Sequence, residues 1–195
     1  MELSQFIWYL IIINIIGFIL FLVNALLHTY TAERQINIVL TLVSLFGGSL
    51  GIVLSMLIFG RKAEKENMMF RVFVACMLVI QIVLFLIIEG YVAPNISLAF
   101  GKFFSDHKIL VVYLIAINFV TMIAFAIDKI AAIKHKSRIR IVTLLGLAFI
   151  GGSVGGLIAM YLFRHKIRMN YFTVGLPLMM VMQIIVLFYS MNAAW

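Results

Sequence analysis

The chain has 195 residues, of which 65% are hydrophobic and 11% are charged, and its mean hydropathy is +1.19. A water-soluble domain of this length cannot bury so much apolar surface. Its apolar runs would also be shorter and broken by a polar face. The formal net charge of +8 does not indicate nucleic-acid binding, since the basic residues stand in short segments between apolar runs, where they orient helices and contact lipid headgroups.

Six apolar segments follow one another along the chain, and each is about 20 residues long, enough to cross the hydrocarbon core of a bilayer. The first segment is too long for the core of a signal peptide, and we expect it to be a retained helix. Residues 93–108 are too few and too polar for a further crossing, and we predict an interfacial linker there. The predicted helices lie at about 5–27, 36–59, 70–92, 109–128, 140–163 and 170–193.

The two halves of the chain align with each other after a shift of about 104 residues. Polar residues and glycines match in order, which chance agreement among apolar letters does not explain. The matched pairs include Tyr9 and Tyr113, Asn14 and Asn118, Gly47-Gly48-Ser49-x-Gly51 and Gly151-Gly152-Ser153-x-Gly155, and, after a two-residue gap, Gln81 and Gln183.

We interpret this similarity as an internal duplication, with a first three-helix repeat at 1–92 and a second at 109–195. Three crossings per repeat turn the second copy upside down relative to the first, about a pseudo-two-fold axis in the membrane plane. The predicted fold class is therefore an all-α integral membrane protein of six transmembrane helices, built as two inverted three-helix repeats. On this topology nine Lys and Arg residues lie on the side of the termini and six on the other. We expect a protein of the cell membrane, and the positive-inside rule then favours both termini in the cytoplasm.

The second repeat carries Asp-Lys, Gly-Gly and Phe-Arg-His-Lys sequences at a specific spacing. The residues concerned are Asn118, Asp128-Lys129, Ala132, Arg138-Ile139, Gly151-Gly152, Gly155, Met160, Phe163-Arg164-His165-Lys166 and Phe172. In these residues the chain resembles DUF1294, a family of small bacterial and archaeal membrane proteins. The resemblance implies a membrane fold and, with the weaker first copy, a fused duplication. It implies no activity and no site residues.

The chain departs from this family pattern in both repeats. In the second repeat Arg140-Ile141 stands where the family has Pro-Glu, and Ile167 replaces a Thr. In the first repeat Asn24-Ala25 stands in place of the Asp-Lys pair, and Gly60-Arg61-Lys62 in place of Arg-His-Lys.

Glycines gather on the predicted second and fifth helices, one helical turn apart. One interpretation is close packing, because small residues let helix backbones approach each other. The other is that Gly-Gly-Ser breaks the helix where a solute binds, as discontinuous helices do in repeat-built transporters. The glycines are Gly47, Gly48, Gly51, Gly151, Gly152, Gly155 and Gly156.

Four amide side chains lie well inside apolar segments, accompanied by two serines. An unpaired amide in hydrocarbon costs about 2–7 kcal/mol, so these side chains must face the bundle interior. They either form hydrogen bonds between helices or line a symmetric polar substrate site in the middle of the membrane, at the interface of the repeats. The residues are Asn14, Asn118, Gln81, Gln183, Ser49 and Ser153.

Charged residues cluster where the predicted helices end. Asp128 ends the fourth helix, and we expect either a headgroup-level residue paired with the basic loop that follows or a carboxylate that couples transport to a proton or cation. The basic residues after the second and fifth helices either extend to lipid phosphate or bind an anionic lipid or phosphorylated solute. They are Arg61, Lys62, Arg164, His165 and Lys166.

The residues leave two functions open. The first is a small membrane transporter or channel for an ion or small polar solute; the alternative is a non-transporting scaffold or an accessory protein that binds anionic lipid. The sequence contains no nucleophile elbow, phosphate loop or metal-ligand spacing, so we expect no enzyme, no cofactor and no metal site. The expected partners are membrane lipids and a small solute or ion, without nucleic acid, and a homo-oligomer is compatible with the sequence.

Overall fold

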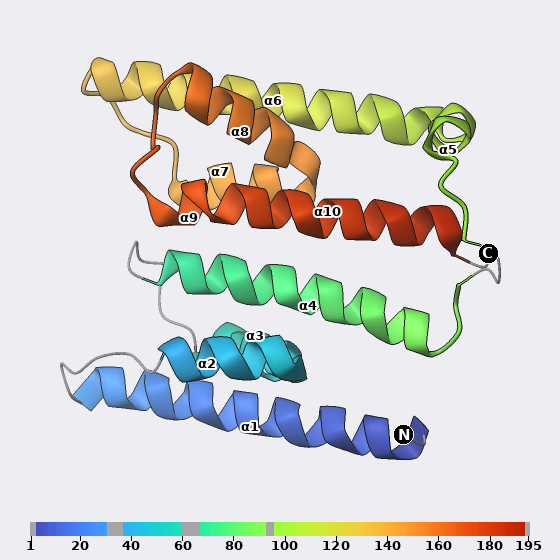
Figure 1. The fold of residues 1–195 in the computed structure, drawn as a ribbon. Coiled ribbons are helices and arrows are strands. Elements are labelled where there is room, and N and C mark those ends of the chain that lie inside the picture. Colours follow the sequence, from blue (N-terminus) through green and yellow to red (C-terminus); the bar gives the residue numbers. More distant parts are fainter. Residues whose placement is uncertain (1–2, 31–36, 60–66, 93–95, 194–195) are drawn as a thin grey trace. The chain divides into compact units, whose positions relative to one another are not determined.

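A computed structural model of the chain describes residues 3–30, 37–59, 67–92 and 96–193 (Figure 1). Within these ranges the regular structure is helical, apart from one isolated bridge between Val92 and Ala193. The chain forms two compact units, an N-terminal unit at Met1–Leu84 and a C-terminal unit at Phe85–Trp195.

Six helical segments of the described chain are long and apolar enough to cross a membrane. They are Gln5–Leu27, Ile38–Phe59, Met68–Ile88, Lys108–Ile133, Ile141–Leu162 and Asn170–Asn192. The six predicted apolar segments are thus confirmed, with most ends within two residues. The third ends earlier than predicted because Gly90 adopts a φ of 87° and the Tyr91 N–H bonds the Leu86 carbonyl at 3.1 Å, a geometry that terminates helices.

The N-terminal unit has two long helices with a broken helical segment between them. Its elements are α1 (Leu3–Tyr30), α2 (Asn37–Val43), the π-helical turn η1 (Ser44–Gly48), α3 (Ser49–Phe59) and α4 (Met68–Ile88), whose last turn crosses the unit boundary. The core contains one or two side chains from each helix: Phe21, Leu40, Ile52, Phe70 and Val74.

The C-terminal unit repeats this arrangement and adds a short helix before it. Its elements are α5 (Phe100–Asp106), α6 (Lys108–Ile133), α7 (Ile141–Leu147), η2 (Ala148–Gly152), α8 (Ser153–Leu162), α9 (Asn170–Thr173) and α10 (Gly175–Asn192). α5 lies in the predicted linker, and the chain before it is tied to the end of α10, where Asn192 Oδ1 accepts the Ser97 N–H at 2.6 Å. Phe125 and Phe172 meet edge to face in the core, with ring centroids 5.4 Å apart.

The predicted second helix is not continuous, because the chain reverses within it. Gly47 in η1 has a φ of 113°, in the left-handed region that favours glycine. Leu40 before the break and Ile52 after it pack in the same cluster. A straight helix would hold residues twelve positions apart at a distance of about 18 Å, so α2 and α3 are the two arms of a hairpin.

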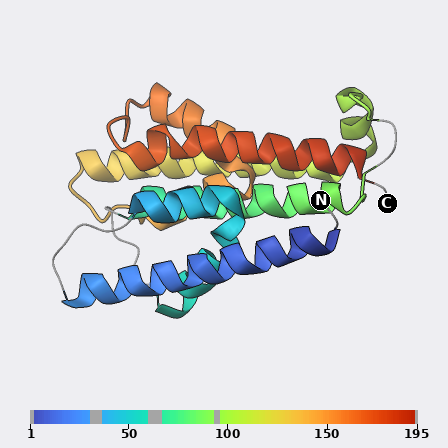
Figure 2. The ribbon, with the colours of Figure 1, turned by 60° about the horizontal axis from the view of Figure 1, so that its bottom comes forward.

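The predicted fifth helix reverses in the same way. Gly151 in η2 has a φ of 134°. Asp128 of α6 accepts hydrogen bonds both from the Ile139 N–H, ahead of α7, and from His165, just after α8. A straight helix over the 22 residues of Ile141–Leu162 would separate its ends by about 33 Å. In both ribbon views α7 leads away from the end of α6 and α8 leads back (Figures 1 and 2).

Six segments have the length and apolarity of membrane crossings, and the count of three crossings per repeat stays a prediction. Each unit has two helices that run its full length, α1 and α4 or α6 and α10, with a helical hairpin between them. The sequence-based inversion of the repeats followed from an odd number of crossings. A repeat that crosses twice would return to the side from which it started, so the inversion of the repeats depends on the number of crossings and stays a prediction.

Candidate functional site

One asparagine of α1 holds the hairpin tip of the N-terminal unit. Asn14 Nδ2 donates to the carbonyl groups of Leu10 at 2.8 Å and Gly47 at 3.0 Å. Its Oδ1 accepts the Gly51 N–H at 2.8 Å. Both amide hydrogens and the amide oxygen are therefore bonded, and the left-handed glycine is fixed to α1.

The C-terminal unit contains the same clamp. Asn118 Nδ2 donates to Leu114 O at 2.8 Å and to Gly151 O at 2.9 Å, and its Oδ1 accepts the Gly155 N–H at 2.6 Å. Each partner stands 104 positions after its counterpart in the N-terminal unit. The residues aligned by the sequence shift thus make equivalent contacts.

Tyrosine hydroxyls bond the carbonyl groups that lose their helical partners at the breaks. Tyr9 donates to Phe46 O at 2.6 Å, and Tyr113 donates to Ile150 O at 2.5 Å. Unpaired backbone groups are costly in an apolar environment. The asparagine and tyrosine side chains together supply partners to the irregular backbone of each tip.

Glutamines of the last long helices bond the tips from another side. Gln81 Oε1 accepts the Ser49 hydroxyl, and Gln81 Nε2 donates to the Ser44 carbonyl at 2.5 Å. In the C-terminal unit the corresponding bonds join Ser153 Oγ to Gln183 Oε1 at 2.5 Å and Gln183 Nε2 to Ala148 O at 2.7 Å. Each tip is therefore bonded both by an asparagine of the unit's first long helix and by a glutamine of its last long helix.

The remaining glycines permit close contact between the hairpin and the long helix. A Cβ atom on Gly51 would stand 1.9 Å from the Asn14 carbonyl oxygen, and one on Gly155 would stand 2.1 Å from that of Asn118. A Cβ atom added to Gly48 would stand 2.9 Å from Ile13 O. One added to Gly152 would stand 1.9 Å from Thr121 Oγ1, and one added to Gly156 would stand 3.2 Å from Leu176 Cδ2. The first glycine of each motif therefore reverses the backbone, and the later ones allow the close approach; solute binding at the break stays a prediction.

The six residues predicted to form one polar site are bonded within their own units. Asn14 joins the network of Ser49 and Gln81 around the tip in the N-terminal unit, and Asn118 joins that of Ser153 and Gln183 in the C-terminal unit. A solute that accepts hydrogen bonds from Asn14, Asn118, Ser49 or Ser153 must replace bonds that already exist. A site shared by the two repeats stays a prediction.

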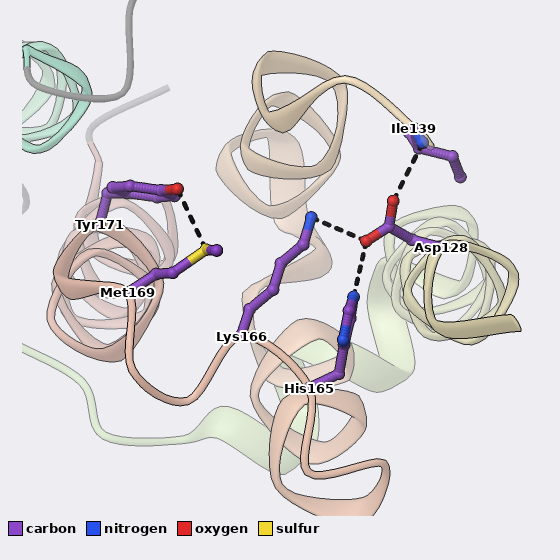
Figure 3. A network of polar contacts seen from close by, with 6 residues as sticks. All are labelled: Asp128, Ile139, His165, Lys166, Met169 and Tyr171. Carbon is purple, nitrogen blue, oxygen red and sulfur yellow. Dashed lines mark hydrogen bonds and ion pairs between the residues drawn. The ribbon is translucent and has the colours of Figure 1, made fainter. Parts of the chain in front are cut away.

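A second polar cluster lies at the open end of the C-terminal hairpin (Figure 3). Asp128 is fully buried on α6, five residues before that helix ends. Its Oδ1 accepts the Ile139 N–H at 3.0 Å, and its Oδ2 meets His165 Nε2 at 2.7 Å and Lys166 Nζ at 2.8 Å. One carboxylate thus joins α6 to both ends of the hairpin.

The backbone after α8 is shaped to direct two side chains toward Asp128. Arg164 and Lys166 have φ values of 46° and 62°, in the left-handed region that residues other than glycine rarely adopt. The His165 N–H bonds the Met160 carbonyl at 3.0 Å, which closes the end of the helix. His165 and Lys166 therefore both reach the same carboxylate oxygen.

Lys166 is enclosed by an anion and an aromatic ring. Its Nζ lies 4.9 Å from the centroid of Phe172, a cation–π contact, and its side chain is only 8% exposed. Burial lowers the pKa of Lys166 below its ordinary value of 10.5; the charge of Arg138 acts in the same direction, and Asp128 opposes both. The ammonium therefore depends on Asp128 as its partner.

The structure changes the interpretation of the charged residues. His165 and Lys166 turn inward to Asp128 rather than outward to lipid headgroups, because a buried carboxylate requires a partner. Asp128 lies inside α6 instead of at its end; it bonds the loop that follows through the backbone N–H of Ile139, while its ion pairs are with His165 and Lys166. Arg164 remains exposed. Arg61 and Lys62 lie outside the described residues.

Sequence reasoning missed that Asp128 and the His165-Lys166 pair form one cluster. The signal is a constant separation: Tyr113 bonds Ile150, Asn118 bonds Gly155 and Asp128 bonds His165, each pair 37 residues apart. A constant separation means that α6 and α8 run parallel in one register. The pattern is recognisable only once the hairpin is known.

Comparison with known proteins places this fold in a class. The model of the family described as "Protein of unknown function (DUF1294)" matches residues 118–172, a stretch that begins at the clamp asparagine and ends at the ring beneath Lys166. The chain is 36% identical over 84 residues to the "Uncharacterized protein YsdA" of Bacillus subtilis (strain 168); the match covers 42% of this chain and 94% of the relative. The chain belongs to the DUF1294 family. No solved structure matches it.

Proposed function

We propose that the protein is a small membrane transporter or channel for an ion or small polar solute, in which both hairpins enter the bilayer and return to the face from which they came. The pair of hairpin tips carries this proposal. Asn14, which holds one tip, stands in the middle of the apolar segment Gln5–Leu27. Irregular backbone at membrane depth is tolerated where it is buried in protein or lines a water-filled cavity. Half-helices that end there bind solutes in transporters.

The distribution of basic residues supports this topology. If both hairpins return to their face of entry, thirteen Lys and Arg residues fall on that face: Arg34, Arg61, Lys62, Lys65, Arg71, Lys129, Lys134, Lys136, Arg138, Arg140, Arg164, Lys166 and Arg168. Two, Lys102 and Lys108, fall on the other. The positive-inside rule then assigns the hairpin openings to the cytoplasm of a cell-membrane protein and both termini to the opposite side. The proposed topology thus differs from the expected one, in which both termini are cytoplasmic.

The groups at the tips favour a neutral polar solute or a monovalent ion. Ser49 and Gln81 at one tip, like Ser153 and Gln183 at the other, offer hydroxyl and amide groups. Divalent metal ions are held mainly by carboxylates. The proposal assigns the protein no catalytic activity and no cofactor, and it names membrane lipids and the solute as partners.

Flux through proteoliposomes tests the proposal. Purified protein is reconstituted, and uptake of Na⁺, K⁺, Cl⁻, glycerol and small amino acids is compared with that of protein-free vesicles. Ser49→Ala combined with Ser153→Ala removes the tip hydroxyls and leaves both asparagine clamps, so flux should fall. Ser105→Ala, on the exposed surface of α5, is the matched control and should leave flux unchanged. No flux of any of these solutes through the unaltered protein would contradict the proposal.

A second function is supported by the saturated hydrogen bonding of the tips. Because Asn14 and Asn118 already use both amide hydrogens and the amide oxygen, the tips also suit a scaffold or an accessory protein that binds anionic lipid. Exposed basic residues such as Arg164 and Arg168 would then contact headgroups. Anionic lipid retained through purification, together with an absence of flux, would favour this alternative.

A further inference from the structure

The N-terminal unit has two buried serine hydroxyls that the C-terminal unit lacks. Ser44 and Ser55 are fully buried, and their hydroxyl groups have no hydrogen-bond partner among the described residues. The aligned residues, 104 positions later, are Ala148 and Ala159. The hairpin fold therefore needs neither hydroxyl. A buried hydroxyl is normally bonded to a protein group, a water molecule or a ligand.

Ser44 belongs to the polar group at the hairpin tip. It opens the turn η1, and its carbonyl group accepts a hydrogen bond from Gln81 Nε2 at 2.5 Å. The oxygen of the same amide accepts the Ser49 hydroxyl. Ser55 lies farther along, within the regular helix α3, where a serine hydroxyl can turn to the carbonyl group four residues before it. The tip therefore brings together three residues with side-chain oxygens, and Ser55 is separate from them.

These oxygens keep lone pairs that the existing bonds do not use. An amide oxygen and a hydroxyl oxygen each have two lone pairs. The bond from Ser49 to Gln81 uses one lone pair of the amide oxygen and none of the hydroxyl oxygen. The Ser44 hydroxyl is free to turn its hydrogen away from the tip. A ligand that only receives lone pairs, such as a metal cation, therefore breaks none of these bonds, unlike a solute that must accept hydrogen bonds.

The electrostatics of the tip favour a cation with a single charge. The carbonyl groups of a helix point toward its C-terminal end, and the arm formed by α2 and η1 ends at the tip. The segment Ile38–Phe59 contains no Lys, Arg, Asp or Glu, so it offers neither repulsion to a cation nor a carboxylate for a divalent one. In transporters, unwound carbonyl groups and the C-terminal ends of half-helices coordinate Na⁺.

We propose that the tip of the N-terminal hairpin binds a monovalent alkali cation through Ser44 Oγ, Ser49 Oγ and Gln81 Oε1. This rests on the proposed transport function, for which it names the class of ion and the unit that binds it. The C-terminal tip keeps the serine and the glutamine, as Ser153 and Gln183, but has Ala148 in place of the first ligand. The two tips thus share an architecture and differ in their capacity for a cation.

Equilibrium binding of radioactive Na⁺, and separately of Rb⁺ as an analogue of K⁺, tests the proposal without a transport assay. Scintillation proximity on the purified full-length protein in detergent measures the bound label. The unaltered protein should bind at least one of the two labels, and unlabelled Na⁺ or K⁺ should displace it whereas choline should not. Ser44→Ala should weaken binding by about tenfold or more, because it removes one of three oxygen ligands.

Ser55→Ala is the matched control. It removes the other buried hydroxyl without a partner from the same unit, and it should leave cation binding unchanged. Ser44→Ala should fold, since the C-terminal unit forms its equivalent hairpin with alanine at this position. Unfolding midpoints check this: the bound cation should raise the midpoint of the unaltered protein and of Ser55→Ala in NaCl or KCl relative to choline chloride, but not that of Ser44→Ala.

Three results would overturn the proposal: no binding of either label to the unaltered protein, equal affinity in folded Ser44→Ala, or an equal loss in Ser44→Ala and Ser55→Ala. Failure of the transport function is separate. It would appear as absent flux of every solute while the label still binds in the Ser44-dependent manner. Flux of a solute without any cation binding would reject the cation site alone.

Discussion

Packing of α8 directly on the α6 backbone makes Gly155→Ala a sharp test of the hairpin structure. The added Cβ would stand 2.1 Å from the Asn118 carbonyl oxygen and 2.8 Å from its carbonyl carbon. Neither atom belongs to a flexible side chain, so α8 must move away. Overpacking of this kind costs about 1–3 kcal/mol.

The same displacement breaks the bond from the Gly155 N–H to Asn118 Oδ1, now 2.6 Å long. An interhelical hydrogen bond in a membrane protein contributes about 0.6–2 kcal/mol. The expected total loss in the free energy of unfolding is therefore about 2–5 kcal/mol. Gly146→Ala is the matched control, because it lies in α7 of the same hairpin with nothing within 4 Å of its added Cβ. It should stabilise the unit by about 0.5–1 kcal/mol.

Reversible unfolding in mixed micelles of dodecyl maltoside and sodium dodecyl sulfate measures both variants. Near-ultraviolet circular dichroism follows the packing of aromatic side chains during the titration. Equal midpoints for Gly155→Ala and Gly146→Ala would refute the close approach of α8 to α6, and with it the parallel register of these helices.

Three further predictions follow from the same contacts. Gly151→Ala places a Cβ atom at a φ of 134° and 3.1 Å from Ile117 Cγ2, so it should destabilise the unit by about 1–3 kcal/mol. Gly101→Ala adds a Cβ atom with nothing within 4 Å and should have little effect in the same titration. Asn118→Ala removes the partners of Gly151 O and Gly155 N–H and should increase hydrogen exchange of residues 147–155, measured by mass spectrometry; unchanged exchange would mean that the clamp is dispensable. Because burial lowers the pKa of Lys166 below 10.5, the unfolded chain binds more protons between the folded and unfolded pKa values, and the free energy of unfolding should rise with pH across that window. Lys166→Met should lack this alkaline rise, and an identical rise in the variant would assign it to another group.

The sequence predicts the helices well and the path of the chain poorly. Runs such as 5–27 and 170–193 have the length and apolarity that a bilayer demands, so their existence follows from composition alone. The reversal at Gly47 and Gly151 does not, because Gly-Gly-Ser is compatible with both a packed continuous helix and a turn. Only the left-handed φ values and the presence of Leu40 and Ile52 in one buried cluster distinguish the two.

One sequence signal for the hairpins exists and was not decisive by itself. With six crossings the basic residues divide nine to six between the faces, and with two returning hairpins they divide thirteen to two. The positive-inside rule prefers the more unequal division. Counting charges for alternative topologies would therefore have favoured the hairpins, although it would not have revealed their partners.

The candidate site, too, could be predicted from the sequence only in part. Asn14 and Asn118 were recognised as buried because hydrocarbon does not tolerate a free amide. Their partners are backbone groups, which the sequence does not distinguish from one another. Asp128 and Lys166 were each recognised as charged residues near helix ends, yet their pairing depends on α8 returning to the end of α6, and this rests on the reversal at Gly151.

Cysteine accessibility in intact cells tests the returning hairpins most directly. Single cysteines replace Ser137, Arg164 and Lys102 in turn, in the Cys76→Ala background, and are treated with a thiol reagent that does not cross membranes. Ser137→Cys and Arg164→Cys, at the two ends of one hairpin, should both be protected until the membrane is permeabilised, while Lys102→Cys should react at once. Reaction of Ser137→Cys and Arg164→Cys on opposite faces would show that residues 141–162 cross the membrane and would contradict the hairpin topology.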